Sequence, residues 1–108
     1  MYSQSTIIRV PMGMMTTMRR LIEQTYLPKV QVRPGFISAF LLEQEDDEDY
    51  AQLIIMWESQ ASAESFAQTG SLEASPQTLV ASIPGTRVQR QGYCVSVQVG
   101  EPEFAPTR

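Results

Sequence analysis

The spacing of apolar positions changes twice in the first third of the chain. Residues 3–10, SQSTIIRV, are rich in β-branched side chains and predict a strand, which Pro11 and Gly13 end. The apolar positions that follow have helical spacing and are Met14, Met18, Leu21, Ile22 and Tyr26. Pro28 is expected to end this helix or to kink its last turn, because proline lacks the N–H of the helical ladder.

A turn and two further strands are predicted next. Pro34 and Gly35 suit the central positions of a type II turn, in which glycine supplies the positive φ. The segment FISAFLLEQ predicts the second strand, the polar run EDDED predicts a hairpin loop, and YAQLIIMWE predicts the third strand. Its unbroken apolar run from Leu53 to Trp57 indicates that this strand is buried on both faces.

Two helices follow the third strand. Ser59 is expected to cap the first of them, and Gly70 to end it. Its apolar stripe is predicted to be Ala63, Phe66 and Ala67. Ser75 and Pro76 suit the cap and the first position of a shorter helix. The stripe of that helix is predicted to be Leu79, Val80 and Ile83, with Pro84 and Gly85 as its end.

The last predicted strand covers residues 86–99, with Val95, Val97 and Val99 on one face. The resulting order, β-α-β-β-α-(α)-β, predicts an α+β protein with a ferredoxin-like four-stranded antiparallel sheet and helices on one face. Because the third strand is apolar on both faces, we expect a second copy to cover the open face in a homodimer. Residues 1–108 form one predicted domain, with 100–108 as a flexible tail.

Composition narrows the classes of function. A net charge of −4 and a pI of about 4.7 argue against nucleic-acid binding, which needs clustered lysine and arginine. No apolar run approaches the ~20 residues of a membrane span, and the N-terminus has no signal-peptide pattern. We therefore expect a cytoplasmic protein. The one cysteine, Cys94, lies in an alternating apolar run and is expected to be a small buried hydrophobe.

The absence of histidine excludes several kinds of site. The chain contains no histidine, which removes Ser-His-Asp and Cys-His catalysis, imidazole metal ligands and a proximal histidine for haem. The acidic run 45–49 lacks the spacing and the glycine of an EF-hand and is expected to be a solvated loop. We therefore predict no metal site and no cofactor.

Two segments resemble the antibiotic-biosynthesis monooxygenase-like family of dimeric α+β barrels. They are RPGFISAFLL, which enters the second strand, and IIMWESQASAESF, which runs from the third strand into a helix. The matching positions are Pro34, Gly35, Phe36, Trp57, Glu58, Ser59, either Ala61 or Ala63, and Phe66. The resemblance implies a dimer whose two sheets form a barrel. Trp57 is interpreted mainly as a packing residue where strand and helix meet.

The resemblance implies three kinds of function. Some similar proteins are cofactor-free monooxygenases of phenolic or quinol-like molecules, some degrade haem, and many have no assigned role. The haem-degrading type uses an asparagine, a tryptophan and a histidine at positions that correspond to Thr6, Phe66 and Pro76. All three differ here, so we expect no haem degradation. A cofactor-free monooxygenase is the leading hypothesis, and a non-catalytic small-molecule-binding or stress-associated dimeric module is the alternative.

A cofactor-free oxygenase needs a dry pocket with a few polar groups that orient and ionise a phenol. The expected pocket lies between sheet and helices and is lined by Thr6, Ile8, Tyr26, Phe40, Phe66 and Leu79. Thr6 and Tyr26 are its polar candidates, with Arg33 or Arg9 to stabilise an anion. Simpler interpretations are that Thr6 is only a strand former, Tyr26 has its hydroxyl in water, and Arg33 is a surface charge.

Overall fold

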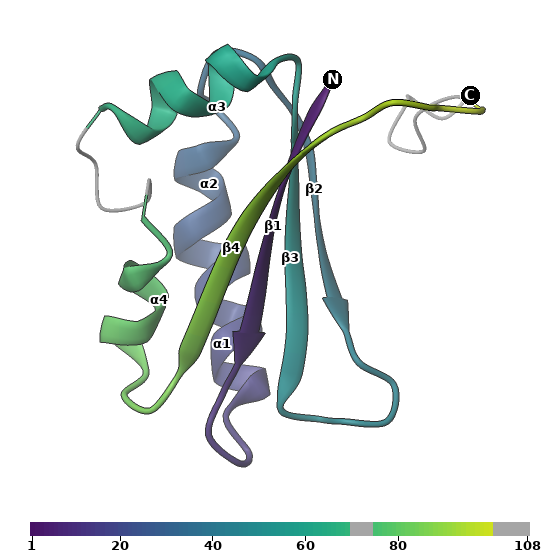
Figure 1. Cartoon of the computed structure of the whole chain (residues 1–108). Coiled ribbons are helices and arrows are strands. Elements are labelled where there is room, and N and C mark those ends of the chain that lie inside the picture. Colours follow the sequence, from purple (N-terminus) through teal and green to yellow (C-terminus); the bar gives the residue numbers. More distant parts are fainter. Residues whose placement is uncertain (70–74, 101–108) are drawn as a thin grey trace.

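A four-stranded antiparallel sheet with all its helices on one side forms the molecule (Figure 1). The computed structural model describes residues 1–69 and 75–100. The strands lie in the order β2-β3-β1-β4, which is the predicted ferredoxin-like arrangement. They are β1 (Tyr2–Arg9), β2 (Phe36–Glu43), β3 (Tyr50–Trp57) and β4 (Arg87–Cys94).

The first helical segment is longer than the sequence pattern predicts. It consists of α1 (Met15–Leu21), a π-helical turn η1 (Ile22–Tyr26) and α2 (Leu27–Val30). Pro28 therefore does not end the helix. The wider π turn ends two residues before Pro28, near the point where the proline interrupts the regular hydrogen-bond ladder. The buried stripe is Met15, Met18, Ile22, Tyr26 and Val30.

Ser59 caps α3 (Gln60–Ala67) as predicted, because its Oγ accepts a hydrogen bond from the Ser62 N–H at 3.1 Å. Ala63 and Phe66 are buried, whereas Ala67 is exposed. The predicted end at Gly70 lies outside the described residues. In α4 (Gln77–Ser82), the Ser75 Oγ accepts from the Gln77 N–H.

The last strand is shorter than predicted. It ends at Cys94, and Val97 and Val99 are 79% and 91% exposed. Cys94 is also exposed, so its predicted burial is wrong for the isolated chain. Alternation alone could not reveal this, because β1 begins at Tyr2, the partner of Cys94, and the chain before it offers only the Met1 carbonyl, which accepts from the Val95 N–H at 3.0 Å. Most of the predicted tail, 101–108, lies outside the described residues.

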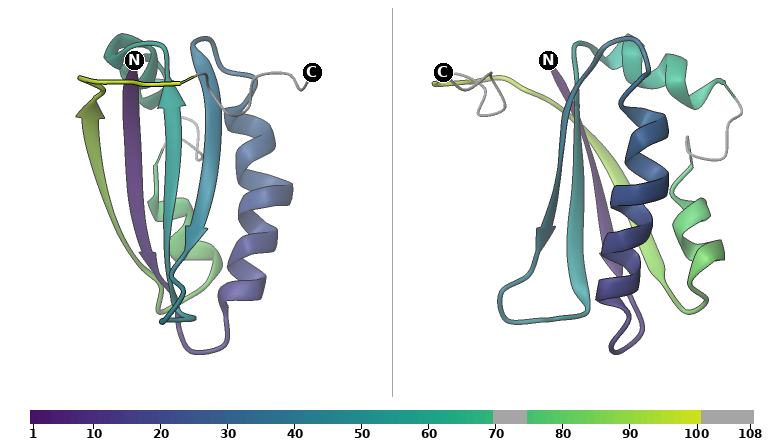
Figure 2. Two further views of the ribbon diagram at one scale, coloured as in Figure 1. Left: turned by 90° about the vertical axis from the view of Figure 1, so that its right-hand side faces the viewer. Right: turned by 180° about the vertical axis from the view of Figure 1, so that it is seen from behind.

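The two faces of the sheet are unlike. The helix-covered face carries the largest buried side chains, including Ile8, Leu53, Ile55 and Trp57. The open face, which is toward the viewer in the left panel of Figure 2, carries the alternate residues. Its apolar members are only partly covered and include Ile7, Phe40, Ile54 and Met56. The apolar side chains of the open face thus lack a covering layer within the described chain.

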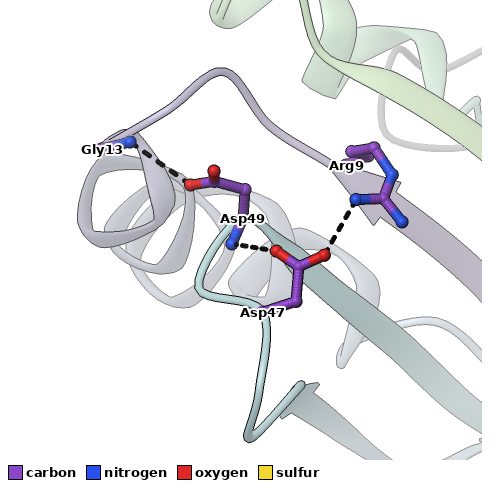
Figure 3. Close-up of polar contacts among 4 residues, drawn as sticks. All are labelled: Arg9, Gly13, Asp47 and Asp49. Carbon is purple, nitrogen blue, oxygen red and sulfur yellow. Dashed lines mark hydrogen bonds and ion pairs between the residues drawn. The ribbon is translucent and has the colours of Figure 1, made fainter.

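Charged contacts gather at the hairpin end of the sheet. The Arg9 Nη1 and the Asp49 N–H both donate to the Asp47 carboxylate at 3.0 Å, and Asp49 accepts from the Gly13 N–H (Figure 3). The Asp49 N–H, and secondarily Arg9, hold the pKa of Asp47 below its usual range. The acidic run is therefore a structured loop that joins the hairpin to the β1–α1 connection.

A second ion pair joins α1 to the end of β2. Arg19 donates to both oxygens of Glu43, at 2.6 and 2.8 Å. This hydrogen-bonded pairing lowers the pKa of Glu43 and raises the pKa of Arg19. Both side chains are substantially exposed, so the pair fixes geometry more than it adds stability.

Candidate functional site

Trp57 anchors the end of the sheet opposite to the β2–β3 hairpin. It is fully buried, and its ring centroid lies 6.1 Å from that of Phe36 and 5.7 Å from that of Phe66. Its Nε1 donates to the Gln4 side chain at 2.9 Å. Strand β3 and helix α3 therefore meet on an aromatic cluster, which agrees with the packing role predicted for Trp57.

The turn before β2 fits the same corner. Gly35 has φ +86°, and the Phe36 N–H donates to the Arg33 carbonyl, as expected for a type II turn. The Gly35 carbonyl accepts from the Glu58 N–H at 2.8 Å, and a Cβ at Gly35 would overlap the Ser62 side chain. Glycine is thus required both for its conformation and for the close approach of α3.

Thr6 and Tyr26 meet through an arginine that the sequence did not indicate. Arg90 donates from Nε to the Thr6 Oγ1 at 3.0 Å and from Nη2 to the Tyr26 hydroxyl at 2.9 Å. Thr6 and Tyr26 are each 1% exposed, and Arg90 is half-buried. The register explains the contact, because Thr6 and Arg90 are direct cross-strand partners on the helix-covered face.

The direction of these hydrogen bonds matters for chemistry. Each hydroxyl oxygen accepts from Arg90, so each hydroxyl proton must point away from the guanidinium. Neither proton has an acceptor among the described residues. The arrangement therefore offers two buried O–H donors beside a positive charge. Such a group suits an anionic oxygen such as that of a phenolate.

Tyr26 owes its place to the π turn, of which it is the last residue. Single π turns inside α-helices are frequent at functional sites. The interpretation that places the Tyr26 hydroxyl in water is wrong, because the side chain is buried and bound to Arg90. Thr6 likewise does more than form a strand, since its hydroxyl takes part in the same network.

Arg33 also differs from its simpler interpretation as a surface charge. Its guanidinium carbon lies 5.8 Å from the Phe66 ring centroid, and the residue is half-buried. Its Nε is buried and has no hydrogen-bond acceptor in the described part of the chain. Arg33 and Phe66 therefore belong to the same corner as Trp57.

Two of the expected pocket residues lie elsewhere. Phe40 pairs with Ile54 on the open face, so it cannot line a space under the helices. Arg9 lies at the hairpin end, paired with Asp47 and 4.8 Å from the Tyr50 ring centroid. The other expected lining residues, Ile8 and Leu79, are fully buried. Strand parity alone could not have excluded Phe40, because a register shift between Phe36 and Ser38, which the sequence does not show, places Phe36 and Phe40 on different faces.

The charged group that binds Thr6 and Tyr26 is the Arg90 guanidinium. Within residues 1–69 and 75–100, no group of three His, Cys, Asp or Glu side chains is arranged to hold a metal ion. Arginine stays protonated and cannot act as a base. The described side chains can therefore bind, orient and stabilise an anion.

Solved structures with the same fold come from several bacteria. No protein-family model matches the sequence, and no curated protein matches it. A candidate antibiotic biosynthesis monooxygenase from Nitrosomonas europaea is 13% identical, has a TM-score of 0.70, and is aligned over 90% of this chain and 100% of its own. SnoaB, a cofactor-independent oxygenase from Streptomyces nogalater, is 14% identical, with a TM-score of 0.71 and coverage of 93% and 97%. The chain has the fold of the antibiotic biosynthesis monooxygenases.

Two further neighbours broaden the functions found on this fold. MhuD, a haem degrader from Mycobacterium tuberculosis with two haems bound in its active site, is 20% identical, with a TM-score of 0.67 and coverage of 93% and 100%. A dimeric ferredoxin-like protein from an uncultured marine organism is 10% identical, with a TM-score of 0.72 and coverage of 91% and 97%. The predicted ferredoxin-like fold and its likeness to this family are thus confirmed, and the likeness concerns the fold alone.

One finding bears on membranes. Among the described residues, no helix combines the length and the apolar character needed to cross a bilayer.

Proposed function

We propose that the protein binds a small phenolic or quinol-like molecule between its sheet and its helices and oxygenates it without a cofactor. The observation that carries the proposal is the pair of buried hydroxyls, Thr6 and Tyr26, whose protons Arg90 directs away from itself. The fold shared with SnoaB supports it. In this chemistry the deprotonated substrate itself reduces oxygen, so the protein must supply a dry, oriented, anion-stabilising site.

Each part of the candidate site has a role in this proposal. The hydroxyls donate to the substrate oxygen and favour its ionised form. Trp57 and Phe66 supply an aromatic wall against which a planar ligand can pack. Arg90 acts on Thr6 and Tyr26 and adds positive charge behind them. The proton released by the substrate passes to water.

The alternative is a non-catalytic binding or stress-associated module with the same site. The observation that favours it is that the group hydrogen-bonded to both Thr6 and Tyr26 is the Arg90 guanidinium, which cannot act as a base. Such a module would bind the same ligands with no oxygen consumption. Haem degradation is not proposed, because Thr6, Phe66 and Pro76 replace the residues that the resemblance associates with it.

We also propose that the protein is a cytoplasmic homodimer in which a second copy covers the open face. Partly exposed apolar side chains on that face support this proposal, as does the dimeric ferredoxin-like neighbour. Neither a nucleic-acid nor a membrane partner is expected. The helix-covered face would then bind the ligand, and the open face would bind the partner.

A screen of phenols and quinols with an oxygen electrode tests the activity, and calorimetry of Tyr26→Phe tests the site. The variant removes one hydroxyl with almost no change in volume. We expect it to weaken ligand binding by roughly 1.5–3 kcal/mol, or about ten- to a hundredfold. Tyr93→Phe is the control, because Tyr93 is half-exposed and on the opposite face. Unchanged affinity in Tyr26→Phe would contradict the role of Tyr26, and binding without oxygen uptake would favour the alternative.

A further inference from the structure

Arg33 is the arginine of the candidate site whose hydrogen bonding is least complete. Its Nε is buried without an acceptor in the described chain. By contrast, Arg9 and Arg19 bind carboxylates, and Arg90 binds two hydroxyls. A buried N–H without an acceptor is costly, and a charged donor especially so. An anionic group on a ligand could therefore supply the acceptor that the Nε–H of Arg33 lacks.

The surroundings of Arg33 hold its planar group in place. The guanidinium lies 5.8 Å from the Phe66 ring centroid, and the backbone of Arg33 is fixed by the turn at Pro34 and Gly35. No acidic side chain of the described chain forms an ion pair with Arg33. A preorganised guanidinium of this kind binds a carboxylate through two parallel N–H donors.

Contacts lead from Arg33 to Gln4, which is two residues from Thr6 on β1. Phe66 packs on Trp57, whose Nε1 donates to Gln4. Gln4 and Thr6 are two residues apart on β1, so their side chains lie on the same face of the sheet. The aromatic pair thus lies between a cation at one side and the hydroxyl donors at the other.

We infer that Arg33 binds a carboxylate on the ligand whose phenolic oxygen is bound by Thr6 and Tyr26. The substrate class would then be aromatic acids that also carry a phenol or quinol hydroxyl. This inference rests on the proposed function, because it assumes that the hydroxyl pair holds the phenolic end.

Hydroquinone and gentisate form a matched pair of probes, since gentisate is hydroquinone with one added carboxylate. Both are titrated without oxygen, so that binding is measured apart from turnover. We expect the unmodified protein to bind gentisate about tenfold tighter than hydroquinone, as a charge-assisted bidentate contact predicts. Arg33→Gln should lose this preference and keep its affinity for hydroquinone. Arg33→Lys should keep part of it, because the charge remains and the planar fork is lost.

Arg20→Gln is the control for the change in net charge, because Arg20 is exposed on α1. It should leave both affinities unchanged. Equal affinity for the two probes, or a preference that survives in Arg33→Gln, would overturn the inference and leave the proposed function standing. A preference that depends on Arg33, together with affinities for both probes that are unchanged in Tyr26→Phe, would support the carboxylate site and contradict the phenolic one. Failure of both probes to bind would overturn both proposals.

Discussion

The two faces of the sheet are formed by the same strands, but their side chains are buried to different extents. On β3, Ala51, Leu53, Ile55 and Trp57 are at most 1% exposed, whereas the residues between them are only partly covered. Side chains of a strand alternate between faces, so this contrast arises within one continuous apolar segment. The helices complete one face and leave the other without a covering layer in the described chain (Figure 2).

Polar groups also differ between the two faces. On the helix-covered face, the hydroxyls of Thr6 and Tyr26 are organised by Arg90. On the open face, Gln52 donates to the Ser5 hydroxyl, and the Ser38 hydroxyl is buried without a partner among the described residues. The helix-covered face is therefore the one on which the proposed ligand would bind. The open face has the mixture of apolar surface and unused polar atoms that suits a protein partner.

Neighbouring isoleucines on β3 provide the sharpest test of this contrast. Ile55→Asp would bury an unpaired carboxylate in the core, and we expect a loss of roughly 5 kcal/mol or more, enough to unfold a small domain. Ile54→Asp places the same group on the open face, so the chain should fold but lose its dimer. Circular dichroism measures folding, and sedimentation at micromolar concentration measures association.

Val32→Asp is the control for adding a carboxylate, because Val32 is 74% exposed in the loop after α2. It should remain folded and dimeric. The proposal of a second copy on the open face fails if Ile54→Asp stays dimeric, or if the unmodified protein sediments as a folded 12.1 kDa monomer.

Trp57→Ala tests the helix-covered face at the aromatic cluster of Trp57, Phe36 and Phe66. Truncating this buried ring should lower the free energy of unfolding by about 3–5 kcal/mol, because its contacts with Phe36 and Phe66 are lost. Met12→Ala, at a side chain that is 90% exposed, should change the free energy of unfolding by less than about 0.5 kcal/mol. Urea unfolding of both variants makes the comparison. A loss near 1 kcal/mol for Trp57→Ala would show that the corner repacks and that the tryptophan is not its anchor.

Most of the fold follows from local patterns in the sequence. The order of helices and strands along the chain, the type II turn at Gly35 and the Ser59 cap were all predictable, since each depends on nearby residues. The predictions were wrong where contacts between distant parts of the chain, or an irregular turn, determine where an element ends. Helix α2 continues past Pro28 because a π turn precedes the proline, and β4 stops at Cys94 where its partner strand begins.

The candidate site was only partly predictable. Thr6, Tyr26 and Phe66 lie on the helix-covered side as expected, because periodicity assigns faces. Arg90 was missed, because its contact with Thr6 depends on the cross-strand register between β1 and β4. The two residues are 84 positions apart in the chain. Its position between Val88 and Gly92, facing Thr6, would have been the available signal once that register was assumed.

The smallest expected effect concerns the hairpin end, where the open and closed faces meet the loops. The folded protein lowers the pKa of Asp47, chiefly through the Asp49 N–H and then through Arg9. A lowered pKa stabilises the fold above the ordinary aspartate pKa of about 4, and this contribution disappears as the pH falls through the lower, folded-state value. Asp47→Asn should therefore reduce the urea midpoint slightly at pH 7 and not at all near pH 2.

Asp46→Asn provides the matched control, because Asp46 is exposed and takes no part in the contacts of Figure 3. Its urea midpoint should follow that of the unmodified protein at every pH. The Asp47 effect at pH 7 should persist partly in high salt, because the hydrogen bond from the Asp49 N–H is local whereas the exposed ion pair with Arg9 is screened. A pH-independent difference would mean that Asp47 acts through loop conformation and not through its charge.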